Sequence, residues 1–216
     1  MSAYIPEPVI KRLPMYYRYL KELESANRLF ISSTELARLT GLTASQVRQD
    51  VNVFGGVGRQ GCGYPVSEMR RYIGKLLGKS NVQKMIIIGM GNLGRAIVHY
   101  EAFLHDGYQT IAVFDCDPQK IGETIGSLTV QQLQQLENVL KAEPADIAVL
   151  TLPASAAQEA ADRLYRCGIR GFWNFAPVDL HLPRDASIVN VHLDESLELL
   201  SYRLHHSSDF GSNGYR

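Results

Sequence analysis

Residues 84–94 read KMIIIGMGNLG, an apolar run followed by three glycines at the spacing GxGxxG. A turn of this kind between a strand and a helix is typical of sites that hold the diphosphate of a dinucleotide. Downstream, Asp115 follows a second apolar run, 111–114, and comes 21 positions after Gly94. An acidic residue at this distance commonly binds the adenosine ribose. The sequence therefore predicts a Rossmann-type nucleotide site.

Each residue of this motif has its own physical reason. Gly89 permits the tight turn, Gly91 lets the backbone approach the pyrophosphate, and Gly94 lets the helix pack closely on the strand. The helix N-terminus offers N–H groups and a favourable dipole to the diphosphate. Asp115 accepts hydrogen bonds from the ribose, and its charge opposes a 2′-phosphate. We therefore predict NADH or NAD as the cofactor.

Apolar runs and helical patterns alternate from residue 84 onward. Alternation of this kind predicts an α/β fold with a parallel sheet covered by helices. Strands are predicted at 84–88, 110–114, 147–152, 171–175 and 187–191, and helices at 93–105, 130–141, 154–167 and 194–204.

Upstream of that sheet, the sequence predicts a winged helix-turn-helix. Ser32-x-x-Glu35 and Thr43-x-x-Gln46 are capping boxes that each start a short helix, and Gly41 ends the first helix. Two short helices around a glycine turn are the layout of a helix-turn-helix. The glycine-rich segment 55–65 suits a hairpin wing with Arg59 at its tip. Two flanking helices are predicted at 8–26 and 67–77.

The neutral net charge hides a strong asymmetry between the two parts of the chain. Residues 1–84 hold 13 Lys and Arg against 6 Asp and Glu, whereas the remainder holds 9 against 16. A basic segment joined to an acidic one is expected when the first faces phosphates. The alternative is a solvated bundle, or a helix-turn-helix used only for protein contacts. Candidate contacts to bases are Ser45, Gln46, Arg48 and Gln49, and candidate contacts to phosphates or a minor groove are Arg12 and Arg59.

Several classes of protein are disfavoured by what the sequence lacks. Its three cysteines form no CxxC or Cys/His cluster, so we expect neither a disulfide framework nor a metal site. No signal peptide or membrane span is apparent, which favours a cytoplasmic protein. Its histidines are scattered and little chain remains for a substrate domain, so we expect no enzyme activity.

Seven sequence runs stand in one order within about residues 5–204: RLPMYYR at 12–18, ISSxELA at 31–37, QVRxD at 46–50, FGxxGxxGxGY at 54–64, GxGNLG at 89–94, FDxDPxKIG at 114–122 and NFAP at 174–177. Taken together, these runs resemble the Rex family of redox-sensing transcriptional repressors. The resemblance implies a winged helix and a Rossmann domain in a homodimer that binds palindromic double-stranded operator DNA and releases it when NADH binds.

The resemblance also implies domain limits and further site residues. It places the winged helix at 1–80, the Rossmann domain at 81–192, a helix swapped between subunits at 193–204 and a loose tail at 205–216. It adds cofactor contacts at Asn92, Leu93, Lys120, Asn174, Phe175 and Pro177, and residues that act in switching at Arg18, Tyr100 and His192.

At three positions the sequence departs from the family pattern. Gln49 and Gln60 stand where basic residues are usual, and His192 stands where the family has an aspartate that exchanges partners between the positions of Arg18 and Tyr100. We therefore expect an altered operator preference and weaker coupling between NADH and DNA. The alternatives are a Rex-like paralogue with another operator or a weak redox response, and a small NAD-dependent oxidoreductase with a basic accessory domain.

Overall fold

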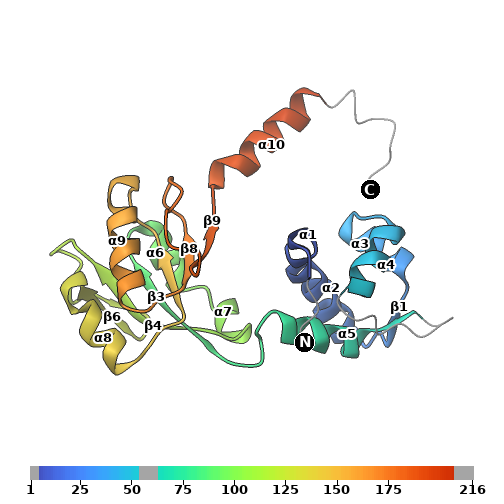
Figure 1. Ribbon diagram of the computed structural model, residues 1–216, viewed down its shortest axis with the longest axis horizontal. Helices are drawn as coiled ribbons and strands as arrows, with labels where there is room; N and C mark the ends of the chain where they lie inside the picture. Colours follow the sequence, from blue (N-terminus) through green and yellow to red (C-terminus); the bar gives the residue numbers. More distant parts are fainter. Residues whose placement is uncertain (1–4, 54–62, 207–216) are drawn as a thin grey trace. The chain divides into compact units, whose positions relative to one another are not determined.

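The structure is a computed structural model that describes residues 5–53 and 63–206. The chain divides into two compact units between Asn81 and Val82. Figure 1 shows helices dominating the first unit and a strand-rich layer with covering helices in the second.

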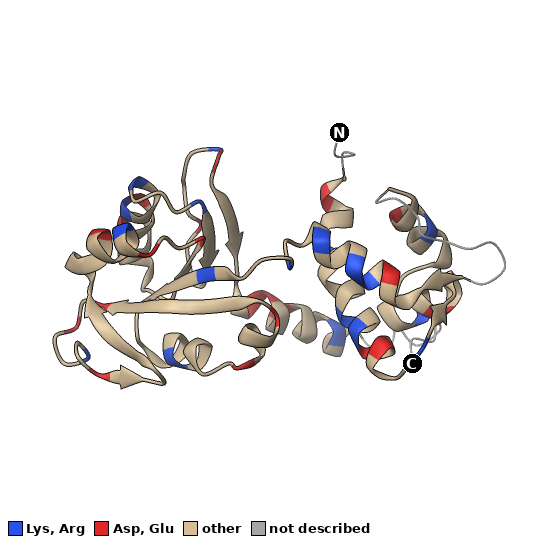
Figure 2. Cartoon of the chain, turned by 90° about the horizontal axis from the view of Figure 1, so that it is seen from below, with Lys and Arg blue, Asp and Glu red and all other residues tan. Residues whose placement is uncertain are grey.

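Unit 1 is a small helical unit with one short two-stranded sheet. Lys and Arg residues recur along its helices (Figure 2). Both predicted N-caps are confirmed, and the capping box at Thr43 is complete, because Gln46 Oε1 accepts a hydrogen bond from the Thr43 amide at 2.9 Å. The Glu35 side chain instead accepts one from Arg28 at 2.7 Å. Ser32 Oγ accepts a hydrogen bond from the Glu35 amide at 3.1 Å, and Thr43 Oγ1 accepts one from the Gln46 amide at 3.1 Å. The elements are α1 (Glu7–Ile10), α2 (Leu13–Ser25), β1 (Phe30–Ile31), α3 (Ser33–Thr40), α4 (Ala44–Val53), β2 (Tyr64–Pro65) and α5 (Val66–Leu76).

Two features of unit 1 differ from the prediction. The single helix predicted at 8–26 is broken between α1 and α2, because Pro14 fits the first turn of a helix but not its interior. β2 pairs antiparallel with β1, which precedes the helix-turn-helix, and no local pattern indicated that pairing. Most of the predicted wing, including Arg59 and Gln60, lies outside the described residues.

Unit 2 contains one seven-stranded sheet in the order β5-β6-β4-β3-β7-β8-β9, in which β5 alone is antiparallel to its neighbour. The order reverses at β3, and ligands of such sheets bind at the carboxyl ends of the strands beside that point. The elements are β3 (Gln83–Ile88), α6 (Asn92–Val98), α7 (Ala102–His105), β4 (Tyr108–Asp115), β5 (Thr124–Ile125), β6 (Leu128–Gln132), η1 (Leu133–Gln135), α8 (Leu136–Ala142), β7 (Ile147–Leu150), α9 (Ala154–Arg166), β8 (Gly171–Asn174), β9 (Ser187–Asn190) and α10 (Leu193–His205).

Two predicted helices of unit 2 are wrong in part. The segment predicted as helix from Val130 begins as strand β6, because Val130 pairs with Val113 and is buried in the sheet. The helix predicted at 93–105 is split into α6 and α7 around His99 and Tyr100, two residue types of low helix propensity.

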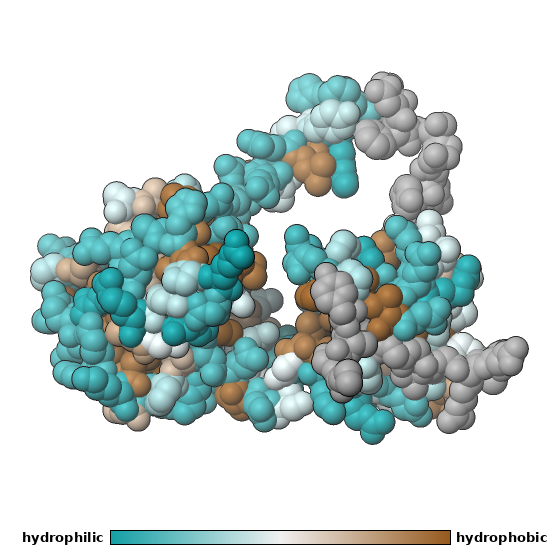
Figure 3. All heavy atoms as spheres, in the orientation of Figure 1, coloured by the Kyte–Doolittle hydropathy of each residue, from teal (hydrophilic) through white to brown (hydrophobic). Residues whose placement is uncertain are grey.

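Helix α10 exposes its apolar side chains in the single chain. None of its residues is buried, and Leu193, Leu197 and Leu204 are 60%, 64% and 67% exposed. Figure 3 shows hydrophobic residues of α10 at the surface. A contiguous exposed apolar stripe of this kind marks an interaction surface. Within the described residues, no helix has the length and apolar character needed to cross a bilayer.

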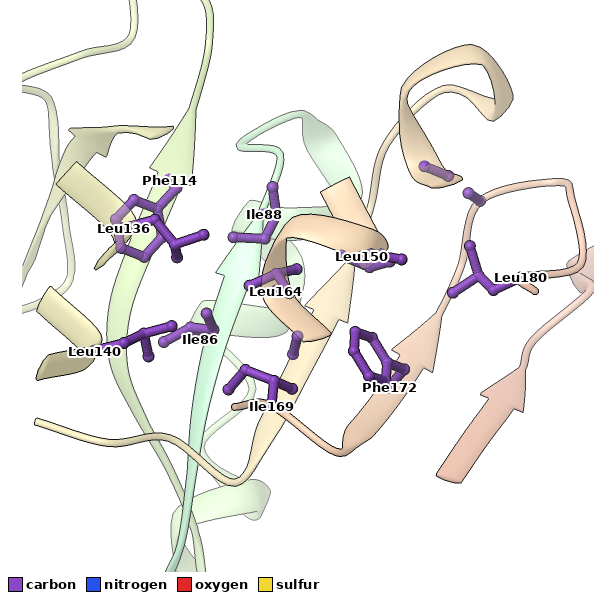
Figure 4. Close-up of a cluster of buried hydrophobic side chains, with 14 of the residues drawn as sticks. Ile86, Ile88, Phe114, Leu136, Leu140, Leu150, Leu164, Ile169, Phe172 and Leu180 are labelled. Atoms are coloured by element: carbon purple, nitrogen blue, oxygen red, sulfur yellow. The ribbon is translucent and has the colours of Figure 1, made fainter. Parts of the chain in front are cut away.

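The core of unit 2 lies on both faces of the sheet. Figure 4 shows Ile86 and Ile88 of β3 beside Leu164 of α9, with Phe114 and Leu136 packed next to them. The opposite face buries a second cluster that includes Ile87 and Ile97. Both faces of a parallel sheet must be covered, which explains why the buried part of β3, residues 85–88, is entirely apolar.

Candidate dinucleotide and nucleic-acid sites

Two of the three motif glycines are required by the protein itself. Gly89 has φ +100°, and a Cβ there would lie 2.6 Å from the Thr151 carbonyl oxygen. A Cβ at Gly94 would collide with the Gly89 carbonyl oxygen. The hydroxyl of Thr151 donates to the carbonyl of Gly89 at 2.6 Å and fastens the turn to the end of β7. The turn is therefore rigid and sits at the point where the strand order reverses.

Gly91 is different, because no protein atom requires it to be glycine. Its backbone is extended, with φ −76° and ψ −168°, and a Cβ there would meet nothing within 4 Å. The open space lies directly at the start of α6, where the amides of a helix begin. A diphosphate fits there only while the side chain is missing. This space is what makes the turn suited to a dinucleotide.

Asp115 lies at the end of β4 and is 7% exposed. Its Oδ2 accepts a hydrogen bond from the Met90 amide at 2.6 Å, and its Oδ1 accepts one from the Asp117 amide at 2.8 Å. Burial raises the pKa of this carboxyl, but the two amides and Lys120 outweigh that effect and hold its pKa below the usual value. Asp115 is therefore a carboxylate at neutral pH.

Lys120 lies beside this carboxylate, with its Nζ 3.2 Å from Asp115 Oδ2 and 3.7 Å from Asp117 Oδ2. The two carboxylates neutralise the ammonium group, so the surroundings of Asp115 offer little attraction to a 2′-phosphate. This arrangement favours a ribose with a free 2′-hydroxyl.

Replacing Asp115 by asparagine is therefore expected to weaken discrimination against NADPH by about tenfold or more, since it removes one of the two carboxylate charges beside Lys120 and with it a charge that repels a 2′-phosphate. Asp115→Ala is expected to weaken NADH binding as well, because it also removes the acceptor of the Met90 and Asp117 amides. Titrations of both variants with NADH and NADPH measure these effects. Wild-type ratios of the two affinities in both variants would contradict the assignment of Asp115.

Asn174 has a positioning role that the sequence did not indicate. Its side chain is fully buried, and its Nδ2 donates to the Val178 carbonyl at 2.7 Å and to Asn190 Oδ1 at 2.9 Å. Its Oδ1 accepts a hydrogen bond from the Ala176 amide at 3.1 Å. Asn174 thus shapes the loop that carries Phe175 and Pro177, the other predicted cofactor contacts of this segment.

Helix α4 presents the predicted base contacts to solvent. Ser45, Gln46, Arg48 and Gln49 are all exposed, whereas Val47 is fully buried on the opposite side. The Nη1 atom of Arg48 donates to the hydroxyl of Ser33 on α3 at 3.2 Å, which steadies the guanidinium at the surface. An exposed polar face near the start of the second helix is what insertion into a major groove requires.

Arg12, predicted to contact DNA, has a protein partner. Its Nε and Nη2 atoms each lie 2.7 Å from a carboxylate oxygen of Asp50, which projects from α4 and is 3% exposed. No sequence pattern indicated this pair, because the two residues are 38 positions apart.

The three predicted switch residues have distinct surroundings. Arg18 lies over the ring of Tyr19, 4.8 Å from its centroid, and Tyr100 is 57% exposed beside Phe103. His192 precedes α10, and its Nε2 lies 3.3 Å from Asp179 Oδ1. Sequence reasoning missed Asp179, which belongs to no motif. Across the residues that the structure describes, no group of three His, Cys, Asp or Glu is arranged to hold a metal ion.

Comparison with known proteins gives matches to both units. The family model described as "CoA binding domain" matches residues 80–178, and the one described as "Putative DNA-binding protein N-terminus" matches residues 4–52. A protein named redox-sensing transcriptional repressor Rex from Caldicellulosiruptor bescii is 45% identical over 196 residues, which covers 91% of this chain and 90% of the relative. The protein of the same name from Clostridioides difficile is 46% identical, and the alignment covers 90% of this chain and 92% of that relative.

Solved structures agree with these relatives. The crystal structure of RSP, a Rex-family repressor, has a TM-score of 0.89 at 42% identity and covers 96% of this chain and 97% of its own. The structure of RSP in complex with NADH has a TM-score of 0.88 at 42% identity and covers 95% of this chain and 97% of the RSP chain. The structure of RSP in complex with NAD+ and operator DNA has a TM-score of 0.89 at 43% identity and covers 96% of this chain and 95% of the RSP chain.

Proposed function

The chain belongs to the Rex family of redox-sensing transcriptional repressors, and we propose that it represses by binding palindromic operators as a homodimer that NADH releases. One observation carries the proposal: the open space at Gly91 follows Met90, whose amide binds the ionised Asp115, and this arrangement suits a dinucleotide. The same chain exposes the polar face of α4, which suits DNA. The crystal structures of RSP with NADH, and with NAD+ and operator DNA, support both ligands.

We further propose that α10 forms the dimer by packing on the partner subunit, as the resemblance implies. Its exposed leucines support this assignment, since association would bury an apolar stripe that the single chain leaves in water. The same proposal includes a winged helix that ends at residue 80 and a Rossmann domain that ends at residue 192. It also includes a cytoplasmic location and the use of NADH as a signal, without catalysis or a metal. The names of the relatives as repressors support the non-enzymatic role.

Operator binding measured with and without each nucleotide tests this function. Fluorescence anisotropy of a labelled palindromic duplex is expected to show weaker binding with NADH than with NAD+ at the same concentration. NADH absorbance in the same sample is expected to stay constant, because the oxidoreductase alternative alone consumes it. Equal DNA affinity with both nucleotides would contradict redox sensing, and steady NADH oxidation would favour the enzyme.

Gln49 is expected to change which operator is preferred. A lysine or arginine donates to O6 and N7 of guanine, whereas a glutamine amide donates and accepts, and so matches N7 and N6 of adenine. Selecting bound sequences from a randomised palindrome with wild type and Gln49→Lys is expected to enrich different half-sites. If both proteins enrich the same half-site, Gln49 reads no base and only tunes affinity.

His192 is expected to make the coupling between NADH and operator weak, in the lower part of the usual range of about 1–3 kcal/mol. A histidine does not supply the fixed negative charge that an aspartate at this position would offer Arg18. His192→Asp is therefore expected to increase the coupling. Because Asp179 lies 3.3 Å from the His192 ring, the matched variant His192→Asp/Asp179→Asn avoids two adjacent carboxylates. Equal coupling in all three proteins would show that this exchange contributes little.

A further inference from the structure

Asp50 is a buried carboxylate on the inner side of the recognition helix α4. Its Oδ2 accepts hydrogen bonds from Arg12 Nε and from the hydroxyl of Tyr16, both at 2.7 Å, and its Oδ1 accepts one from Arg12 Nη2 at 2.7 Å. Tyr16 is fully buried, and Asp50 is 3% exposed. A single carboxylate thus joins α4 to α2 and to the residue that precedes α2.

A network of this kind contributes geometry more than stability. Burying a charged pair costs desolvation energy that apolar packing would avoid, so net stabilisation is a weak reason for its presence. The two parallel bonds from a planar guanidinium, however, fix distance and orientation together. The apolar neighbours of Asp50 on α4, Val47 and Val51, pack without such directional bonds.

The same geometry argues against a direct phosphate contact by Arg12. Two of its nitrogen atoms are engaged by Asp50, and the carboxylate neutralises its charge at 2.7 Å. Attraction to the DNA backbone depends on cations that displace counterions, which a neutralised guanidinium does poorly.

We propose that Arg12, Asp50 and Tyr16 form a positioning network that sets the orientation of α4, so that Arg12 acts on DNA through Asp50. The proposal rests on the proposed function and adds a source of specificity to it. The network carries no base contact itself. It fixes how Arg48 and Gln49, on the exposed side of α4, meet the groove.

Paired variants in the full-length protein separate positioning from phosphate contact. Arg12→Gln, Asp50→Asn and the double variant are compared for affinity to operator, affinity to unrelated duplex DNA, and dependence of both on salt. Positioning predicts that each single variant loses about tenfold or more in the ratio of operator to unrelated affinity. It also predicts that the double variant loses no more than the worse single variant, and that the salt slope is unchanged.

Direct phosphate contact predicts the opposite pattern. Arg12→Gln would then lower the affinity for both DNAs and reduce the salt slope. Asp50→Asn, which removes a negative charge and frees Arg12, would bind both DNAs as well as wild type or better. That pattern overturns the proposal. A matched control is Arg163→Gln in unit 2, which removes an arginine from a similar two-bond pair with Glu137 and is expected to leave the ratio unchanged.

Two further variants keep the test decisive if Arg12→Gln or Asp50→Asn fails to fold. Tyr16→Phe removes one hydrogen bond from Asp50 and keeps the ring, and Arg12→Met/Asp50→Leu replaces the pair with apolar groups. Both are expected to retain NADH binding and to lower the affinity ratio. Wild-type ratios in these folded proteins overturn the inference alone. A wild-type protein that binds no operator overturns the proposed function and this inference together.

Discussion

Gly91→Val is expected to abolish NADH binding, with a loss of at least about 100-fold in affinity, while the protein stays folded. The backbone at Gly91 is extended, which valine adopts freely, and a Cβ there meets no protein atom within 4 Å. The branched side chain would instead occupy the space where the diphosphate lies. Gly91 is the N-cap residue of α6, and replacing glycine there lowers the stability of the protein by at most about 1 kcal/mol.

The single tryptophan of the chain, Trp173, offers a direct measurement. The centroid of its ring lies 4.6 Å from the ring centroid of Phe175, a predicted cofactor contact. Energy transfer from Trp173 to bound NADH therefore measures the fraction of protein that holds NADH. Gly91→Ala is the graded control and is expected to lose less affinity. Gly94→Ala is the opposite control, because its Cβ collides with the Gly89 carbonyl and is expected to lower the unfolding temperature. Unchanged NADH affinity in Gly91→Val would refute the placement of the diphosphate.

Arg48→Ala is expected to weaken operator binding by about 1–3 kcal/mol per half-site, which a palindrome doubles in a dimer. Arg48 is exposed on α4, and its Nη1 atom donates to the Ser33 hydroxyl at 3.2 Å. This bond holds the guanidinium at the surface, where it can donate to O6 and N7 of a guanine. Operator affinity and affinity for unrelated duplex DNA, each measured over a range of salt concentrations, separate the two forms of contact. A base contact lowers the operator affinity selectively.

A phosphate contact at Arg48 would have another signature. Both affinities would then fall together, and the magnitude of the salt slope would decrease by about one unit for each phosphate that is no longer neutralised. Arg71→Ala, which removes an exposed charge from α5 in the same unit, controls for charge alone. Operator affinity equal to wild type in Arg48→Ala, at every salt concentration, would contradict the role of α4 as the recognition helix.

Features set by neighbouring residues were predictable from the sequence. The N-cap bonds at Ser32 and Thr43 join residues three positions apart, and the structure contains both. Strand β3 was also predictable, because its buried part, residues 85–88, is covered on both faces and is entirely apolar.

Features set by distant partners were not predictable. Val130 has a helical neighbourhood in sequence, yet pairing with Val113 makes it part of a strand. Asp50 has no local pattern that marks it as buried, and its partners Arg12 and Tyr16 lie more than thirty positions away. The glycine motif, in contrast, did predict close packing at Gly94 and open space at Gly91. A Cβ at Gly94 would collide with the Gly89 carbonyl, and a Cβ at Gly91 would meet nothing within 4 Å.

NADH and operator are expected to bind the same molecule and to oppose each other. Linkage requires the effect to be reciprocal, so operator must weaken NADH binding by the same factor by which NADH weakens operator binding. The decisive measurement is NADH affinity by Trp173 energy transfer, with and without saturating operator. We predict a loss of NADH affinity in the lower part of the usual range of about 5-fold to 150-fold with operator present, equal to the loss of operator affinity with NADH. Identical NADH affinity in the two titrations would contradict redox control of DNA binding by this protein.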